Sequence, residues 1–343
     1  MVAVPASLIA AVGLSFILAY LAIPAFNRFM VVAGIVGRDV MKKEERPIPD
    51  MGGPGVLVGF LLGIFLYIGF ETFALKSSQD LIYILASLST ILIITLIGIF
   101  DVLTSLMKLR EGAGIFERLK RRGIPQWFYF FIPLPAAVPL MAVAAGVTHM
   151  NLPLFGRVDL GLAYPLILVP LAVLCCSNAT NFLAGFNGLE AGMGTVLLAS
   201  LGAFALLSNK TAAAALSLIF ATALLAFLRY NWYPAKVFPG DLNYTIGAVA
   251  ACVTVLGNME KFAIICFTPW IAEALLKAAS RFDAETYGVL QQDGTVKPRG
   301  GRIGSLAHIV MRSGSFTEAQ VTGILIVVEV IVCAIAFAVI QYI

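Results

Sequence analysis

The sequence predicts an all-α integral membrane protein, in which residues 1–343 form one polytopic bundle of transmembrane helices. Hydrophobic residues make up 60% of the chain and charged residues only 12%, whereas a soluble domain has about 25% charged residues. Apolar runs of about 20 residues, the length needed to cross a bilayer, recur about ten times along the chain. Basic residues gather on alternate connections between these runs, which is typical of a polytopic membrane protein.

The predicted helices follow the apolar runs in order, and charged or turn-forming residues set their ends. The first run has no basic start and is too long for the apolar region of a signal peptide, so we expect it to remain as a spanning helix. Gly53 and Pro54 open the second run and Pro133 lies in the fourth, which lipid-embedded helices tolerate when neighbouring groups satisfy the backbone. The predicted segments are 4–27, 53–72, 80–100, 127–147, 161–181, 191–208, 212–230, 243–258, 262–279 and 319–341.

The distribution of Lys and Arg predicts the orientation in the membrane. An even number of crossings divides the connections into two sets, and 19 of the 23 basic residues fall on or beside one set. The positive-inside rule places that set in the cytoplasm and both termini outside. The predicted cytoplasmic loops are about 28–52, 101–126, 182–190, 229–242 and 280–318.

Two acidic residues fall inside late apolar runs. Glu273 lies near the inner end of the ninth run, and Glu329 lies near the middle of the tenth. Each is suited either to a proton or ion relay or to a hydrogen bond between packed helices, and the sequence leaves both readings open.

The unusual polar residues gather on the predicted cytoplasmic side. An Asn- and Gly-rich stretch at 177–192 lies there with Asp39, Asp50, Asp101 and Asp241. The Asn residues alone fit either hydrogen bonds between helices or a pocket for a metal ion or nucleobase. A transporter or lipid flippase remains an alternative, but transporters more often bind substrate near the midplane on repeated halves. Chemistry at one face favours an enzyme that joins a water-soluble substrate to a lipid.

Several cytoplasmic segments have the composition of a ligand site. The first loop ends in a Pro- and Gly-rich run, 47–53, where small residues leave room for a ligand at a helix N-terminus; its basic residues alone would also suit anionic lipid headgroups. Asp101 ends the third helix, where it could bind Mg²⁺, accept a proton or be solvated. Phe238 precedes Asp241 at the start of the eighth helix, so an aromatic ring lies near a carboxylate suited to a helix cap or a hard cation.

Four motifs together resemble the polyprenyl-phosphate N-acetylhexosamine-1-phosphate transferases. The resemblance is nearest to the eukaryotic and archaeal branch that makes GlcNAc-diphosphodolichol from UDP-GlcNAc, the first membrane step of lipid-linked glycan assembly for N-glycosylation. It implies a membrane enzyme with UDP-GlcNAc and a polyprenyl (dolichyl) phosphate as substrates, Mg²⁺ as cofactor and no nucleic acid as partner. The motifs are NATN (178–181), NGLEAG (187–192), NWYP (231–234) and VFPGD (237–241).

The resemblance also implies a role for individual residues. Asn181 and Asp241 would bind Mg²⁺, Asn187 would recognise the uracil edge, and Phe238 would stack on the uracil. Asp39 would bind the donor and Arg299 its sugar or pyrophosphate. The implied catalytic residues are Lys42, near the pyrophosphate, Asp101 and Asp241.

The sequence departs from the family in two respects. The family usually has two aspartates at the end of the third helix, where this chain has Phe100 and Asp101, so the role of the first carboxylate in handling the lipid phosphate is in question. The His-rich signature of the bacterial cell-wall branch is absent, although a transferase for undecaprenyl phosphate or another UDP-sugar remains an alternative. The resemblance leaves open the membrane, endoplasmic reticulum or archaeal plasma membrane, and the oligomeric state, a homodimer included.

Overall fold

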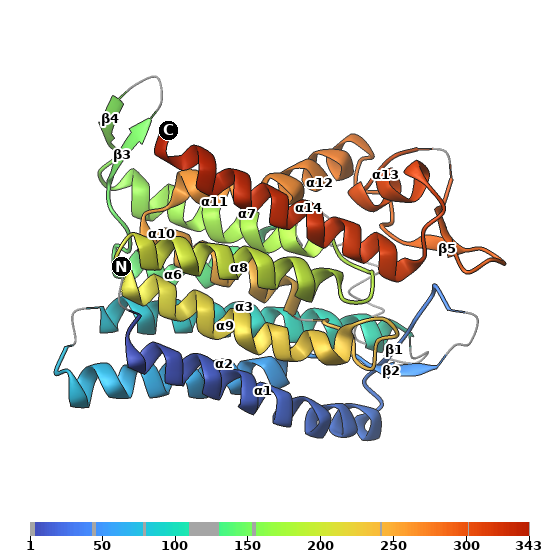
Figure 1. Ribbon diagram of the computed structural model, residues 1–343, viewed down its shortest axis with the longest axis horizontal. Coiled ribbons are helices and arrows are strands. Elements are labelled where there is room, and N and C mark those ends of the chain that lie inside the picture. The colour runs from blue at the N-terminus through green and yellow to red at the C-terminus, as the bar shows by residue number, and fades with distance from the viewer. Residues whose placement is uncertain are drawn as a thin grey trace.

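Helices dominate the computed structural model, which describes residues 4–42, 46–77, 80–109, 130–152, 156–240, 242–300 and 302–342. The long helices run side by side along the longest axis of the molecule (Figure 1). They are α1 (Ala6–Ala33), α2 (Gly53–Gly69), α3 (Leu81–Leu109), α7 (Val169–Phe182), α8 (Leu189–Leu207), α9 (Thr211–Asn231), α10 (Leu242–Gly257), α12 (Thr268–Ala279) and α14 (Glu318–Val339).

Shorter elements connect or extend these helices. The short helical segments are η1 (Phe70–Ala74), η2 (Leu134–Ala137), α6 (Val138–Ala142), η3 (Tyr164–Leu168), α11 (Glu260–Cys266), α13 (Leu306–Ser313) and η4 (Ile340–Tyr342). Antiparallel hairpins pair β1 (Val36–Arg38) with β2 (Pro47–Pro49), β3 (His149–Leu152) with β4 (Gly156–Asp159), and β5 (Gly288–Leu290) with β6 (Val296–Pro298).

The structure confirms an all-α polytopic membrane architecture. Within the described residues, seven helices are long and apolar enough to span a membrane, and α11 with α12 forms an eighth, bent candidate. This pair bends by 62° around Phe267, next to Pro269, which has no backbone N–H to continue the helical ladder. Two further predicted segments are shorter than a straight crossing: α10 has 16 residues, and the described part of 127–147 contains the helical residues Phe130 and Phe131 followed by the short helices η2 and α6.

Two helices extend well beyond the predicted ends of their apolar runs. α1 has 28 residues and α3 has 29, which at the rise of an α-helix gives a length of roughly 42 Å. That length exceeds the hydrocarbon core of a bilayer, about 30 Å thick. The predicted loops 28–52 and 101–126 therefore begin as helix, because a helix satisfies its own backbone whether or not lipid surrounds it.

The two ends of the bundle carry different structures. Both termini lie at the end that carries β3 and β4, and the hairpin β1–β2, strand β5 and α13 lie at the opposite end (Figure 1). Segments from the first loop and from the connection before α14 thus meet at one end of the bundle.

α7 packs closely against α10 near the polar end of the bundle. A Cβ atom at Gly247 would collide with the Cys176 carbonyl, so the glycine allows the two backbones to touch. Near the same end the Thr180 hydroxyl donates to the Asn243 carbonyl oxygen at 2.7 Å. The end of α7 is thereby held against the first turn of α10.

Candidate active site

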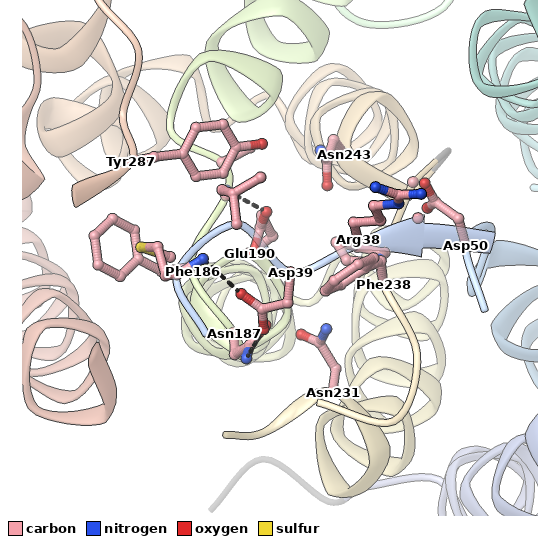
Figure 2. A pocket seen from close by; sticks show the side chains of 17 residues that line it. Arg38, Asp39, Asp50, Phe186, Asn187, Glu190, Asn231, Phe238, Asn243 and Tyr287 are labelled. Atoms are coloured by element: carbon pink, nitrogen blue, oxygen red, sulfur yellow. Dashed lines mark hydrogen bonds between the residues drawn. The ribbon is translucent and has the colours of Figure 1, made fainter. Parts of the chain in front are cut away.

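A polar cavity of about 270 Å³ opens at the end of the bundle opposite the termini. Its walls come from segments that are far apart in sequence: the β1–β2 hairpin, the turn between α7 and α8, the loop after α9, the start of α10 and the segment before β5 (Figure 2). The side chains that carry polar or aromatic chemistry into it are Arg38, Asp39, Asp50, Phe186, Asn187, Glu190, Asn231, Phe238, Asn243 and Tyr287.

The NGLE motif makes the sharp turn that joins α7 to α8. Gly185 and Gly188 have φ angles of +119° and +82°, a backbone region that side-chain-bearing residues rarely adopt. Glu190 accepts a hydrogen bond from the Gly185 N–H at 2.8 Å, and Asn231 accepts one from the Gly188 N–H at 3.1 Å. These two side chains fix the turn from both sides and place Asn187 at the cavity wall.

Asn187 is held at three of its polar groups. Its backbone N–H donates to Glu318 Oε1 at 3.0 Å, and its carbonyl accepts from the Thr322 hydroxyl at 3.1 Å. Its side-chain Nδ2 donates to Asp39 Oδ2 at 3.0 Å (Figure 2). Because an ionised carboxylate only accepts, Asp39 fixes which way the amide faces and leaves the amide oxygen for another partner.

Backbone hydrogen bonds tie Phe238 to the first loop. Its N–H donates to the Pro49 carbonyl at 2.8 Å, and its own carbonyl accepts from the Gly52 N–H at 2.9 Å. The ring packs over Gly37, where an added Cβ atom would lie 3.1 Å from the Phe238 ring. The glycine therefore lets the ring pack closely against β1, and the half-buried ring presents its remaining surface to the cavity.

The cavity brings together acids that differ in environment. Burial raises the pKa of Asp50, partly offset by a hydrogen bond from the Met51 N–H. Burial also raises the pKa of the Tyr287 hydroxyl, and the nearby Glu190 carboxylate adds to that rise. Arg38 supplies a basic side chain to the same wall. The cavity thus presents both acidic and basic side chains to a ligand.

Two buried oxygens at the cavity have no hydrogen-bond partner within the described part of the chain. They are Oε2 of Glu190 and Oδ1 of Asn243. A buried polar atom without a partner is costly, so such atoms at a cavity wall indicate where a ligand or cation would be received.

Asn181 and Asp101 lie around one tyrosine beside the cavity. The Asn181 Nδ2 donates to the Tyr244 hydroxyl at 3.0 Å, which turns the amide oxygen away from that hydroxyl. The Asp101 carboxylate acts electrostatically on the same hydroxyl. The predicted metal ligand and the predicted third-helix acid are therefore brought together at the junction of α3, α7 and α10.

The other predicted site residues have different positions. Lys42 is 18% exposed and pairs with Glu318 and Asp39, and it is not among the residues that line the cavity. Arg299 is 66% exposed, pairs with Glu285 at 2.9 Å, and also does not line the cavity. Asp241 lies outside the described residues, although its neighbour Gly240 lines the cavity.

Sequence reasoning missed several residues that the structure brings to the site. Tyr287 and Asn243 line the cavity, and Glu318 contacts Asn187 from behind it. Thr317, three residues before Gln320, gives the sequence signature of a helix start, and the capping box between these two residues forms there. That signal marks Glu318 as the first residue of α14 but does not indicate its partner in a distant turn.

An apolar groove of about 540 Å³ lies between α7, α10, α11 and α12. Asn178, Ala179 and Phe182, at the end of α7 near the cavity, contribute to it, and at its other end lie Tyr164 and Glu260. Bulky residues are spaced out by small ones, including Ala172, Ala251, Ala263 and Ala274. The groove has the shape and polarity to receive a hydrocarbon chain from the bilayer.

Comparison with known proteins places this architecture in a family. Residues 82–258 match the model for glycosyl transferase family 4. A protein of Sulfolobus acidocaldarius is 32% identical over 310 residues, 88% of this chain and 87% of that protein. A Schizosaccharomyces pombe protein is 31% identical over 324 residues, 80% of this chain and 68% of that protein.

Both relatives carry the name UDP-N-acetylglucosamine–dolichyl-phosphate N-acetylglucosaminephosphotransferase, provisionally in the archaeal case. A Bacillus subtilis protein named, again provisionally, as an undecaprenyl-phosphate N-acetylglucosaminyl 1-phosphate transferase is 27% identical over 250 residues, 71% of this chain and 62% of that protein. The matched region contains all four motifs recognised in the sequence, which confirms the resemblance. The chain belongs to glycosyl transferase family 4.

Proposed function

We propose that this protein transfers GlcNAc-1-phosphate from UDP-GlcNAc to a polyprenyl phosphate of the dolichyl type, giving a GlcNAc-diphospho-lipid and UMP. One observation carries the proposal: a polar cavity lined by Asn187 and Phe238 lies at one end of α7, the same helix that forms a wall of the apolar groove. A water-soluble donor and a membrane-bound acceptor each find a surface of matching polarity. The names of the family relatives supply the sugar and the lipid.

The cavity suits the uridine end of the donor. The exposed face of the Phe238 ring can stack on a base, and such stacking contributes about 1–3 kcal/mol per base. The Asn187 amide oxygen, oriented by Asp39, can accept from the N3–H of uracil, and cytosine has no hydrogen at that position. Arg38 on the same wall can meet the charge of the pyrophosphate.

The oxygen-rich corner near Asn181 suits a hard cation. Mg²⁺ prefers oxygen ligands and usually keeps substrate phosphates and waters in its shell. The unpartnered Asn243 oxygen and the Asn181 amide oxygen have that chemistry, and Asp241 would add an anionic ligand. When bound, the cation would stabilise negative charge on the pyrophosphate and the departing UMP.

The acceptor would place its polyprenyl chain in the groove and its phosphate near the ends of α3 and α7. A phosphate oxygen attacks the β-phosphorus of UDP-GlcNAc, a new P–O bond forms, and the bond to the UMP oxygen breaks. Asp101, beside Tyr244, would orient the lipid phosphate or accept its remaining proton. A phosphate monoester is already largely ionised near neutral pH, so positioning matters more than basicity.

The same proposal sets the orientation of the protein. The cavity lies at the end of the bundle that carries the Lys- and Arg-rich first loop, opposite both termini. We therefore place the cavity on the cytoplasmic face, where nucleotide sugars are supplied, and the termini on the other face.

The test is a reconstitution with purified full-length protein. UDP-GlcNAc, dolichyl phosphate and Mg²⁺ are supplied, and UMP release and lipid-linked sugar are measured together. We expect equal amounts of the two products and none when either substrate is omitted. Movement of an intact lipid or nucleotide sugar across the vesicle membrane without UMP release would replace the transferase with a transporter.

A further inference from the structure

A group of charged side chains surrounds Asn187: Asp39 lines the donor cavity, and Lys42 and Glu318 lie beyond its lining. Lys42 Nζ lies 2.6 Å from Glu318 Oε2 and 3.5 Å from Asp39 Oδ2. The ammonium also lies 3.6 Å from the centre of the Tyr233 ring. Glu318 and Asp39 are 3% and 5% exposed, and neither Glu318 nor Lys42 is among the cavity-lining residues.

These side chains restrain the groups of Asn187 that a ligand does not touch. Glu318 binds its backbone N–H, Asp39 binds its side-chain Nδ2, and Thr322 donates to its carbonyl. Glu318 and Thr322 are one turn apart on α14, so the helix grips the backbone of the turn on both sides of the residue. None of these contacts among the described residues occupies the amide oxygen, which is left to face a ligand.

Lys42 makes this arrangement electrostatically tolerable. Two buried carboxylates that approach the same residue would repel one another, and each would be costly to keep ionised. The Lys42 ammonium lies between them and neutralises one charge, and the Tyr233 ring face adds a further favourable contact to it. Without the ammonium, the two carboxylates would repel one another and their hydrogen bonds to Asn187 would change.

We propose that Lys42 and Glu318 are positioning residues that set the nucleobase selectivity of the donor site through Asn187. The inference rests on the proposed function and deepens it, because it assigns the choice of uracil partly to Lys42 and Glu318, which do not line the cavity. All three side chains that act on Asn187, together with Lys42, come from segments outside the matched family region 82–258. The first loop and the last helix thus take part in donor choice.

The discriminating measurement is the ratio of UDP affinity to CDP affinity, obtained by calorimetry on the full-length protein in detergent. The two nucleotides share the ribose and the pyrophosphate and differ at the edge that Asn187 reads. A substitution that loosens Asn187 should bring the ratio of UDP affinity to CDP affinity closer to one. A substitution that removes a direct phosphate contact should lower the affinities for UDP and CDP equally and leave the ratio unchanged.

Glu318→Gln keeps an oxygen for the Asn187 N–H but removes the charge that Lys42 needs. We expect UDP affinity to fall about 5- to 30-fold, the effect of one or two kcal/mol, and CDP affinity to fall much less. Glu329→Gln is the matched control, because Glu329 is a buried glutamate on the same helix that accepts a hydrogen bond from the Cys333 thiol at 3.2 Å. It should leave the ratio unchanged, and the KM for dolichyl phosphate should stay the same in both variants.

Lys42→Met separates positioning from direct contact with the pyrophosphate. Positioning predicts a narrowed UDP-to-CDP ratio and little further change when Glu318→Gln is added, because the pair acts as one unit. Equal losses of UDP and CDP affinity would instead make Lys42 a phosphate ligand and overturn the proposal for this residue.

A second variant decides the matter if Glu318→Gln does not fold. Thr322→Val keeps the shape of the side chain and loses the hydrogen bond to the Asn187 carbonyl, so the ratio should narrow about 2- to 10-fold. An unchanged ratio in every folded variant, or an equal change in Glu329→Gln, would overturn the inference. A parent protein that binds neither nucleotide would overturn the proposed function itself.

Discussion

The apolar groove runs along helix α7 and the polar cavity lies just beyond the end of that helix, and the two are built by opposite means. The cavity is assembled from loops whose side chains are fixed by hydrogen bonds over long sequence separations, such as Asn187 to Asp39. The groove is formed mainly by helix faces, with Met150 of β3 added and small residues where the wall recedes. The cavity therefore has the means to select its ligand by hydrogen bonding, whereas the groove selects by apolarity and width.

The largest expected effect comes from the anionic group predicted to serve the cation. Asp241→Asn should lower turnover by about 100-fold or more, because charge stabilisation worth several kcal/mol is lost from the transition state. The measurement is UMP release as a function of Mg²⁺ concentration, with folding checked by size-exclusion chromatography. Turnover and Mg²⁺ dependence equal to those of the parent would remove Asp241 from the metal site.

The next largest effect concerns Phe238, which lines the donor cavity and not the groove. Phe238→Ala should weaken UDP binding by about 1–3 kcal/mol, the contribution of one stacked base. The KM for dolichyl phosphate should not change, because Phe238 lines the cavity and not the groove. Phe16→Ala, at a 37% exposed phenylalanine on α1 away from both sites, is the control. A rise in both the Kd for UDP and the KM for dolichyl phosphate would show that Phe238 does not act on the donor site alone.

The converse variant narrows the groove. Ala172→Trp, on the groove wall, should raise the KM for dolichyl phosphate about 10-fold, since overpacking costs about 1–3 kcal/mol. UDP affinity should be unchanged. Ala10→Trp, on an exposed face of α1, introduces the same side chain away from the groove. Loss of UDP affinity in Ala172→Trp, with the acceptor KM unchanged, would contradict the assignment of the groove to the lipid.

The smallest effect concerns pH. Burial raises the pKa of Asp50, so its ionisation destabilises the folded state as pH rises from the ordinary value of 3.8 through the raised value. Asp50→Asn removes that penalty. The difference between the melting temperature of the variant and that of the parent should therefore increase in favour of the variant as pH rises through this window.

Asp159, an exposed acid at the opposite end of the bundle, should show the opposite dependence of stability on pH. Hydrogen bonds from Gly161 and Thr148 lower the pKa of Asp159, so its ionisation stabilises the folded state above its ordinary pKa and the benefit is lost as pH falls. The melting temperature of Asp159→Asn should therefore fall further below that of the parent as pH rises. The same trend in both variants would contradict the assigned environments.

The sequence predicted the helical bundle well because apolar composition decides where helices cross lipid. It predicted less well where the helices end. α1 and α3 continue past the apolar run, since nothing in the following residues forces a helix to stop. The bend between α11 and α12 also went unpredicted, although Pro269 marks it in retrospect.

The candidate site was predicted to different extents for different residues. Asn187, Phe238 and Asp39 all line one cavity, and glycines with positive φ angles at 185, 188 and 240 mark the turns beside Asn187 and Phe238 in the sequence; the roles of these residues stay predictions. The places of Lys42 and Arg299 depend on partners elsewhere in the chain, Glu318 and Glu285. Glu318 is separated from Asn187 by 131 positions, and no local pattern encodes such a contact.

Donor labelled with ³²P at its β-phosphate tests the central claim most directly. If the lipid phosphate attacks the β-phosphorus of UDP-GlcNAc, the label must pass into the organic phase with the lipid, in equal amount to unlabelled UMP in the aqueous phase. Label recovered as UDP would mean transfer of the sugar alone, and label remaining in intact UDP-GlcNAc with dolichyl phosphate and Mg²⁺ present would mean no transfer. Either result would contradict the account in which the cavity and the groove bring donor and acceptor together.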